Sequence, residues 1–209
     1  FTGGEPLLRK GLPAIVAATH EFGARTALTT NGLGLERIAH ALHDAGLDRV
    51  NVSLDSIDPA TFAAITRRDR LSDVIAGLKA AADAGLRPVK VNAVLLRGIN
   101  ETEAPNLLRW CLDRGYELRF IEQMPLDPQH GWRREDMVTA DETLELLSAS
   151  HRLTALDGRG SAPAERYLVD DGPHVVGIIG SVTRPFCGDC DRVRLTADGQ
   201  VRNCLFARD

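Results

Sequence analysis

The feature that most constrains the fold is a regular alternation of short β-rich runs with helical patterns over the first two thirds of the chain. The β-rich runs lie at 26–30, 49–55, 89–96 and 118–122, and helical patterns lie at 35–45, from 59 onward, at 71–84 and at 104–114. Such alternation is typical of βαβ units, whose strands form a parallel sheet. We therefore predict an α/β fold and favour a partial (β/α) barrel over an open doubly wound sheet, which periodicity alone does not exclude.

The pattern changes after about Pro125. Residues 127–132 resemble a loop, a helix is expected over 140–150 behind the N-cap Thr139, and β-rich runs follow at 164–169 and 174–179. We predict two parts: an incomplete barrel core over 1–125 and a small α+β extension over 126–209. The chain opens on a glycine-rich turn and closes soon after its last cysteine, so we expect a segment of a longer protein.

Charge and cysteine usage narrow the function classes. The formal net charge is −4 over 209 residues, which gives no overall attraction to nucleic acid or to an anionic membrane. No apolar run approaches the roughly 20 residues that cross a bilayer, and no secretory signal opens the chain. Three of the four cysteines are clustered, unlike a secreted disulfide framework. We therefore expect a cytoplasmic protein with neither nucleic acid nor membrane as a partner.

Cys187, Cys190 and Cys204 form the most specific local pattern. The first two make a CxxC, and a hairpin over 195–201 would return the third to them. Three thiolates leave one coordination place unfilled, which is incomplete for structural zinc but suits a [4Fe–4S] cluster with one open iron. A redox CxxC beside an unrelated thiol, and a zinc site completed by His or Asp, remain alternatives. Cys111 lies in a helical run and is expected to be a buried hydrophobe.

Several charged residues are candidates for ligand contacts. In an extended strand Arg192 and Arg194 point to the same face, where two guanidinium groups suit a polyanion such as a nucleoside triphosphate. The alternative is a pair of solvated arginines on an edge strand. Lys90 lies within an apolar strand, so we expect either a phosphate or carboxylate partner or an edge position facing water. Polar residues end the predicted strands, where barrels place their chemistry: Thr29, Ser53, Lys90 and Glu122.

Gly3 and Gly4 can adopt a positive φ and allow close approach of a ligand. Glu5 offers an anionic partner next to them, and Pro6 is expected to start a helix.

In combination these motifs carry a family resemblance. They are Gly-Gly-Glu-Pro at 3–6, Thr-Thr-Asn-Gly at 29–32, Asn-Val-Ser-Leu-Asp at 51–55, Val-Lys-Val-Asn at 89–92, Arg-Phe-Ile-Glu at 119–122 and the three-cysteine set. The sequence resembles the radical S-adenosylmethionine GTP 3′,8-cyclases of molybdenum-cofactor biosynthesis. The most specific stretch is Pro-Phe-Cys-x-x-Cys-x-Arg-x-Arg-Leu-Thr-Ala-Asp-Gly at 185–199.

The resemblance implies roles for individual residues. Gly4, Ser53 and Met124 would contact S-adenosylmethionine. Thr29, Lys90, Arg119, Arg192, Val193 and Arg194 would bind GTP. Cys187, Cys190 and Cys204 would hold an auxiliary [4Fe–4S] cluster whose open iron engages the guanine. A second [4Fe–4S] cluster is expected on a CxxxCxxC loop upstream of this chain.

The reaction implied is the radical cyclisation of GTP to (8S)-3′,8-cyclo-7,8-dihydroguanosine 5′-triphosphate, the first step of molybdopterin biosynthesis. A radical derived from S-adenosylmethionine would take hydrogen from C3′, which then closes onto C8. A molybdopterin-precursor synthase would receive the product, and a homodimer would be compatible with this role. Lacking the upstream loop, the chain alone is expected to be inactive. The alternatives are a non-catalytic zinc- or iron–sulfur-stabilised module and a radical enzyme acting on another substrate.

Overall fold

The computed structural model describes residues 1–126 and 131–206. Its main sheet has seven strands in the order β1-β2-β3-β4-β7-β6-β5. They are β1 (Ala27–Thr30), β2 (Arg49–Ser53), β3 (Val89–Val94), β4 (Glu117–Ile121), β5 (Leu153–Leu156), β6 (Glu165–Val169) and β7 (Val175–Ile179). The first four strands and β7 run parallel, and β6 pairs antiparallel with both β5 and β7. Of the loop predicted at 127–132, residues 127–130 lie outside the described residues.

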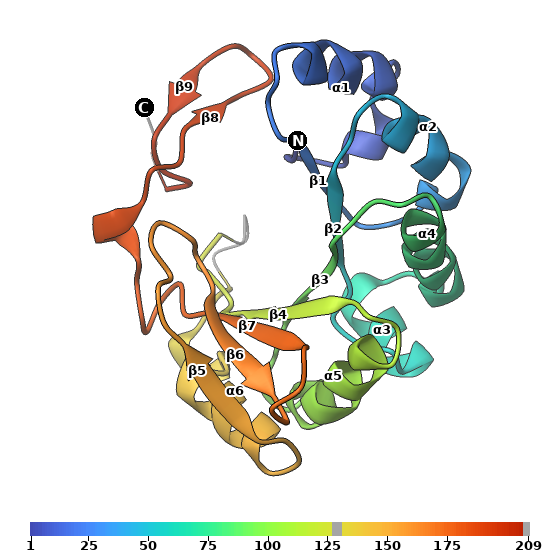
Figure 1. Ribbon diagram of the computed structural model, residues 1–209. Coiled ribbons are helices and arrows are strands. Elements are labelled where there is room, and N and C mark those ends of the chain that lie inside the picture. Colours follow the sequence, from blue (N-terminus) through green and yellow to red (C-terminus); the bar gives the residue numbers. More distant parts are fainter. Residues whose placement is uncertain (127–130, 207–209) are drawn as a thin grey trace.

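The helices lie along the outer side of a sheet that curves into an arc (Figure 1). The α-helices are α1 (Leu12–Glu21), α2 (Ala39–Asp44), α3 (Pro59–Thr66), α4 (Leu71–Asp83), α5 (Ala104–Leu112) and α6 (Ala140–Ser148). Short 3-10 turns are η1 (Pro6–Leu8), η2 (Leu35–Arg37), η3 (Glu101–Glu103), η4 (Arg134–Asp136) and η5 (Cys187–Asp189). The predicted α/β fold with a partial barrel is confirmed.

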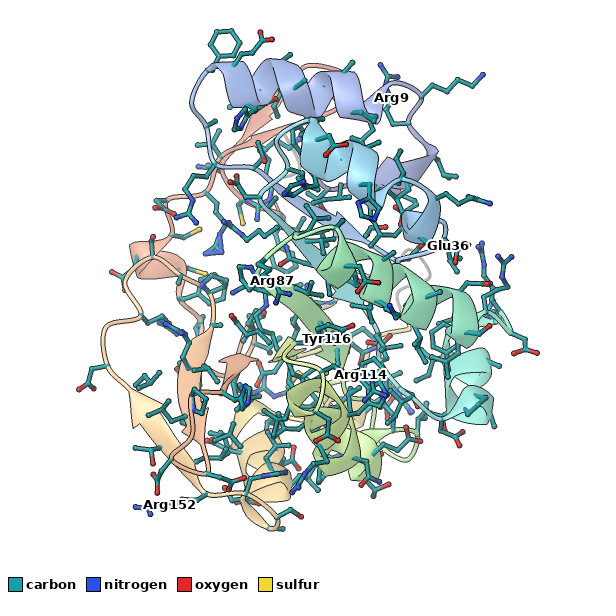
Figure 2. The ribbon with its side chains drawn as sticks, turned by 45° about the vertical axis from the view of Figure 1, so that its right-hand side comes forward. Arg9, Glu36, Arg87, Arg114, Tyr116 and Arg152 are labelled. Carbon is teal, nitrogen blue, oxygen red and sulfur yellow. The ribbon has the colours of Figure 1, made fainter. Side chains whose placement is uncertain are left out.

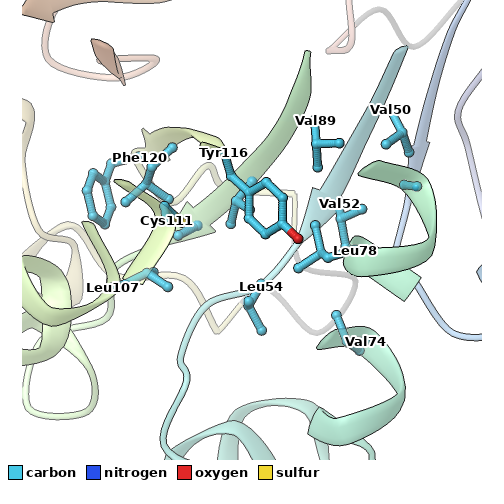
Figure 3. Close-up of a cluster of buried hydrophobic side chains, with 14 of the residues drawn as sticks. Val50, Val52, Leu54, Val74, Leu78, Val89, Leu107, Cys111, Tyr116 and Phe120 are labelled. Atoms are coloured by element: carbon cyan, nitrogen blue, oxygen red, sulfur yellow. The ribbon is translucent and has the colours of Figure 1, made fainter. Parts of the chain in front are cut away.

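Burial alternates along the strands and places the core between the sheet and its helices. In β1 to β4 every second residue is buried, and all of these except Thr30 are apolar: Leu28, Val50, Val52, Val89, Val91, Ala93, Leu118 and Phe120. These side chains meet those of helices α4 and α5, among them Leu78 and Leu107 (Figure 3). Cys111 is fully buried in the same cluster, as predicted. The opposite face of the strands is therefore left for polar residues.

The predicted boundary at 125/126 does not interrupt the sheet, because β7 pairs in parallel register with β4. The division into 1–125 and 126–209 stays a prediction. A separate two-stranded sheet, β8 (Arg194–Leu195) with β9 (Val201–Arg202), confirms the expected hairpin, and Gly199 in its turn has a φ of +85°. Pro6, expected to start a helix, opens only the 3-10 turn η1, and helix α1 begins later, at Leu12. Strand β5 was not predicted. No described helix is long and apolar enough to cross a membrane.

Candidate active site

Polar side chains of β1 to β4 occupy the inner side of the curved sheet, away from the helices. The register groups them into two layers, with Thr29, Asn51, Lys90 and Glu117 in one and Ser53, Asn92, Arg119 and Gly177 in the next. The second layer is nearer the carboxyl ends of the parallel strands, where barrels place ligands. The structure thus brings four predicted site residues to one face: Thr29, Ser53, Lys90 and Arg119.

Asn51 links two of these predicted contacts. Its Nδ2 donates to Thr29 Oγ1 at 3.0 Å, and its Oδ1 accepts from Arg119 Nη2 at 2.8 Å. Burial lowers the pKa of the Arg119 guanidinium from an ordinary value far above neutral, so the group keeps its charge. Three strands are therefore joined by side-chain hydrogen bonds on the inner face.

Lys90 is held by a carboxylate from the neighbouring strand. Its Nζ lies 2.5 Å from Glu117 Oε1, and both side chains are about one-fifth exposed, at 19% and 21%. Burial lowers the pKa of Lys90, while the hydrogen bond and charge of Glu117 act in the opposite direction. Of the partners that we expected for Lys90, the structure therefore shows a carboxylate. The sequence did not predict that this carboxylate belongs to Glu117.

The glycine turn lies beside the carboxyl end of β1. Gly3 and Gly4 have φ values of +84° and +46°, and no atom lies within 4 Å of where a Cβ would be. Glu5 is not left available to a ligand: its carboxylate accepts from Thr30 Oγ1 at 2.6 Å and from the Asn31 N–H at 2.8 Å. Glu5 therefore fastens an open turn to the strand, and Gly4 remains accessible.

Ser53 lines a small cavity of about 180 Å³ at the carboxyl end of β2. Asp55 and two arginines of the α3–α4 loop, Arg68 and Arg70, also line it. Asp55 Oδ1 accepts from the Val94 N–H at 2.8 Å, and burial raises the pKa of its carboxyl. A polar ligand seated here would meet both hydroxyl and guanidinium groups.

The three clustered cysteines line one cavity of about 240 Å³. Its other walls are partly apolar and partly basic: Ile121, Met124, Ile179, Ser181, Phe186, Arg192, Arg194, Asn203, Leu205 and Phe206. The prediction that Arg192 and Arg194 share a face is confirmed, since both line this cavity. Val193 points elsewhere and is 71% exposed. Met124, predicted at the cofactor, thus lies with the cysteines.

The donor set of this cavity fits an iron–sulfur cluster. All three thiols are exposed, and the Phe206 N–H donates to Cys204 Sγ at 3.4 Å, a type of hydrogen bond that tunes cluster sulfurs. In the part of the chain that the structure describes, no three Cys, His, Asp or Glu side chains converge on a single metal ion. A cubane places a different demand on the thiols, because each cysteine ligates a separate iron of the cluster.

Arg192 is positioned by an aromatic ring at this cavity. Its guanidinium carbon lies 4.7 Å from the centroid of Phe186, and its Nη2 donates to the Ser161 carbonyl at 3.3 Å. Its buried Nε finds no partner among the described residues. Arg194 Nη1 donates to the Asn203 carbonyl at 3.5 Å. Both guanidinium groups therefore keep donors for an anion.

Glu122 differs from the expectation for a strand-end residue. It is 4% exposed and its carboxylate accepts from the backbone N–H groups of Ala140, Val182 and Thr183. Because these donors belong to the protein, Glu122 joins β4 to helix α6 and to the segment after β7. The described contacts of Glu122 are therefore structural.

A further cavity, of about 370 Å³, opens at the amino ends of β3 and β4. Arg87, Arg114 and Tyr116 line it (Figure 2). No predicted site residue is among its described lining residues. The candidate site is therefore at the other end of the strands.

Sequence reasoning missed four residues of the inner face: Asn51, Asn92, Glu117 and Gly177. Asn51 could have been found, since it precedes Ser53 by two positions and must share its face. Glu117 precedes Arg119 by two positions and shares its face in the same way. Gly177 carries no such signal, because its place in the site depends on which strands become neighbours.

The class of protein follows from its similarity to known families, which agrees with this curved sheet and its polar inner face. Residues 1–111 match the Radical SAM superfamily, and the chain belongs to that superfamily. Residues 116–209 match Molybdenum Cofactor Synthesis C. The chain is 63% identical over 213 residues to a GTP 3′,8-cyclase of Streptomyces coelicolor, covering 100% of this chain and 62% of that protein. It is 58% identical over 216 residues to GTP 3′,8-cyclase 2 of Mycobacterium tuberculosis, covering 100% of this chain and 60% of that protein.

The chain thus spans about three fifths of the length of these relatives. Two solved structures share its fold. A structure of TYW1 with a lysine-pyruvate adduct bound gives a TM-score of 0.55 at 20% identity, covering 75% of this chain and 51% of that chain. A domain of pyruvate-formate lyase-activating enzyme from Bacteroides vulgatus gives a TM-score of 0.54 at 16% identity, covering 71% of this chain and 91% of that chain. At these identities the likeness concerns the fold alone.

Proposed function

We propose that the complete protein is a GTP 3′,8-cyclase that forms the C3′–C8 bond of (8S)-3′,8-cyclo-7,8-dihydroguanosine 5′-triphosphate. The observation that carries this proposal is the cavity in which three cysteines meet Arg192 and Arg194. An open metal position beside two guanidinium groups suits a ligand that has both a base and a triphosphate. Identity to GTP 3′,8-cyclases over the whole chain supports the same substrate.

Two groups of residues would hold the cofactors. The open turn at Gly4 and Ser53 would receive S-adenosylmethionine, and Met124 would contact the same cofactor from the cysteine cavity that it lines. The three cysteines would hold an auxiliary [4Fe–4S] cluster. When bound, S-adenosylmethionine and the reducing [4Fe–4S] cluster expected upstream supply the radical chemistry. The proposed setting is the cytoplasm, the proposed recipient of the product is a molybdopterin-precursor synthase, and homodimerisation remains a prediction.

The remaining residues bind and shield the nucleotide. Arg192 and Arg194 would hold the triphosphate, and Val193, which lies between them in the chain, would contact the same nucleotide. Thr29, Lys90 and Arg119 would contact GTP from the inner face of the sheet. Apolar walls of the cysteine cavity, such as Ile121 and Ile179, would keep water from the reacting atoms.

The test is anaerobic reconstitution of the complete protein with iron and sulfide, followed by incubation with a reductant, S-adenosylmethionine and GTP. We expect 5′-deoxyadenosine and the cyclised nucleotide as products. Cys187→Ala should lose the iron of one cluster together with cyclisation. Cys111→Ala is the matched control and should keep both, because Cys111 is buried in the core away from the cavity.

Two results would overturn the proposal in different directions. A colourless protein that binds one zinc ion would identify a non-catalytic module. A brown protein that cleaves S-adenosylmethionine, but whose cluster spectrum GTP leaves unchanged, would identify a radical enzyme with another substrate. Arg192→Ala should abolish any spectral change caused by GTP.

A further inference from the structure

The cavity at the amino ends of β3 and β4, which we call the basal cavity, lies at the opposite end of the strands from the candidate site. Its polar groups come from Arg87, Arg114 and Tyr116 (Figure 2). Its wall is otherwise apolar, with Pro88 and Val89 among the lining residues. None of these residues has a role in the proposed cyclisation, so the chemistry of the basal cavity is separate from that reaction.

The Tyr116 hydroxyl is an unused hydrogen-bonding group of the basal cavity. Tyr116 is 7% exposed, and its ring belongs to the core between the sheet and its helices (Figure 3). Its hydroxyl has no hydrogen-bond partner among the described residues, and yet it is not closed off from solvent. Burial raises the pKa of Tyr116 above its ordinary value of 10.0, so the hydroxyl keeps its proton at neutral pH and can donate it to a ligand.

Arg114 is oriented in the same cavity by aromatic contacts. Its guanidinium carbon lies 4.3 Å from the centroid of the Trp110 ring, and the Trp110 and Tyr116 ring centroids are 5.8 Å apart. Arg114 Nη1 donates to the Trp110 carbonyl at 3.1 Å. Its Nε and Nη2 donate to no residue that the structure describes. The guanidinium group is therefore held in place with donors to spare, which lowers the entropic cost of binding a ligand.

Arg87 brings a second guanidinium group without an acidic partner. Its backbone N–H donates to the Asp48 carbonyl at 3.0 Å, which fixes the chain just ahead of β3. The Asp48 carboxylate accepts from Thr26, and within residues 1–126 and 131–206 no carboxylate forms an ion pair with the Arg87 side chain. The Arg87 side chain is exposed, so its donors are open to a ligand in the cavity.

The charge around the basal cavity is positive. Tyr116 lies within the electrostatic influence of Arg114, Lys79 and Asp83, and Asp83 is paired with Lys79 Nζ at 2.5 Å. Together with Arg87 these groups are three cations and one carboxylate. Helices α4 and α5 both end beside the cavity, and cations offset the negative ends of their dipoles. That role accounts for Arg114 Nη1, but it leaves the Tyr116 hydroxyl without a partner.

We propose that the basal cavity binds the phosphate group of a small molecule, with Arg87, Arg114 and Tyr116 as the donors. A phosphate is tetrahedral and has several acceptor oxygens, so it can accept from two guanidinium groups and a hydroxyl at once. A carboxylate has two oxygens in one plane and satisfies fewer donors that approach from different directions. The cavity, at about 370 Å³, is larger than a phosphate ion, and Pro88 and Val89 offer apolar contact to the rest of the molecule.

The test measures the Kd of inorganic phosphate by calorimetry with the complete reconstituted protein. All samples carry Arg192→Ala and Arg194→Ala, so that the proposed GTP site does not compete for the probe. Arg87→Ala and Arg114→Ala should each raise the Kd about tenfold, and Tyr116→Phe should raise it about threefold. Arg109→Ala is the matched control, because it removes the same charge from an exposed position of α5 outside the cavity, and it should leave the Kd unchanged.

Hydrogen exchange measured by mass spectrometry locates the bound phosphate. Phosphate should slow exchange in peptides covering 84–90 and 110–117, and Arg114→Ala should remove this protection. Because Arg114 also caps the end of α5, its substitution can lower stability without any ligand. Thermal unfolding in the absence of phosphate measures that loss separately, and Arg87→Ala, which removes no side-chain contact of the fold, should weaken phosphate binding all the same.

Acetate is the comparison ligand and should bind at least about tenfold more weakly than phosphate. Equal affinity for acetate would overturn the proposal, since the cavity would then select a carboxylate. The proposal also fails if no phosphate binding is detected, if Arg87→Ala and Arg114→Ala leave the Kd of phosphate unchanged, or if protection appears only within 186–206. These outcomes do not depend on GTP cyclisation, so they leave the proposed function untouched.

Discussion

The Glu122 carboxylate, 4% exposed at the end of β4, lies among four donors. Backbone N–H groups of Ala140, Val182 and Thr183 donate to it at 2.7 to 2.8 Å, and the Thr183 hydroxyl donates as well. Ala140 is the first residue of α6, so the negative charge also meets the positive end of the helix dipole. One side chain thus satisfies donors from two segments that are distant in sequence.

We predict that Glu122→Ala lowers the free energy of unfolding of the complete protein by about 3–5 kcal/mol, because several buried donors lose their acceptor at once. Urea unfolding followed by circular dichroism measures this. Glu145→Ala, on the exposed side of α6, is the matched control and should change the free energy of unfolding by less than about 0.5 kcal/mol. Equal effects of the two substitutions would contradict the proposed role of Glu122 as the acceptor that joins these two segments to β4.

The sequence identified which inner-face residues are polar but not which of them pair. Lys90 was expected to need a partner, and the choice of Glu117 depends on β3 and β4 becoming neighbours in a register that places the two side by side. Register is set by the turns and by the buried faces of both strands together. Such a partner therefore appears only when the sheet is known.

At the scale of elements, helix α6 begins with a capping box. Thr139 Oγ1 accepts from the Glu142 N–H at 3.2 Å, and Glu142 Oε2 accepts from the Thr139 N–H at 2.8 Å. The N-cap was predicted from sequence, because its signal is local. The Thr139 N–H, followed by the Arg97 guanidinium, holds the pKa of Glu142 below its usual range.

This lowered pKa predicts a pH-dependent contribution to stability. A carboxyl whose pKa is depressed in the folded state stabilises the fold above its ordinary pKa of 4.5, and that stabilisation is lost as the pH falls through the depressed value. Glu142→Gln should therefore be about 0.5 kcal/mol less stable than the parent at pH 7, and this deficit should shrink progressively as the pH falls below 4.5. Thermal unfolding across this range, with Glu145→Gln as control, measures the difference. A deficit of Glu142→Gln that stays constant with pH would contradict the assignment.

Elements with clear periodicity or caps were predicted close to their observed bounds, and two without such signals were missed. Helix α1 has Gly11 as its N-cap residue, which has a φ of +75° and supplies no side-chain cap. Strand β5 has no fully buried residue, so its sequence shows no alternation between core and solvent. Both elements are stabilised by tertiary packing rather than by local preference, which explains why sequence patterns did not reveal them.

At the scale of the molecule, the parallel pairing of β4 with β7 makes one sheet of segments that sequence reasoning assigned to two parts. Four residue pairs join these strands, from Leu118–Val176 to Ile121–Ile179. Both strands contribute buried side chains to one core cluster. The hydrogen bond from the Val182 N–H to Glu122 also joins the end of β4 to the segment after β7. Ile121 of β4 and Ile179 of β7 both line the cysteine cavity, so the shape of this cavity depends on the pairing of the two strands.

We therefore predict that residues of β2 and β6 unfold in one cooperative transition. Hydrogen exchange measured by mass spectrometry at increasing urea reports on peptides covering Arg49–Ser53 and Glu165–Val169 separately. Because the two strands belong to one continuous sheet, their amides should become exchangeable at the same urea concentration. Glu122→Ala should move both midpoints down together. Loss of protection in β6 at a clearly lower urea concentration would instead establish 126–209 as an independent folding unit docked on the barrel.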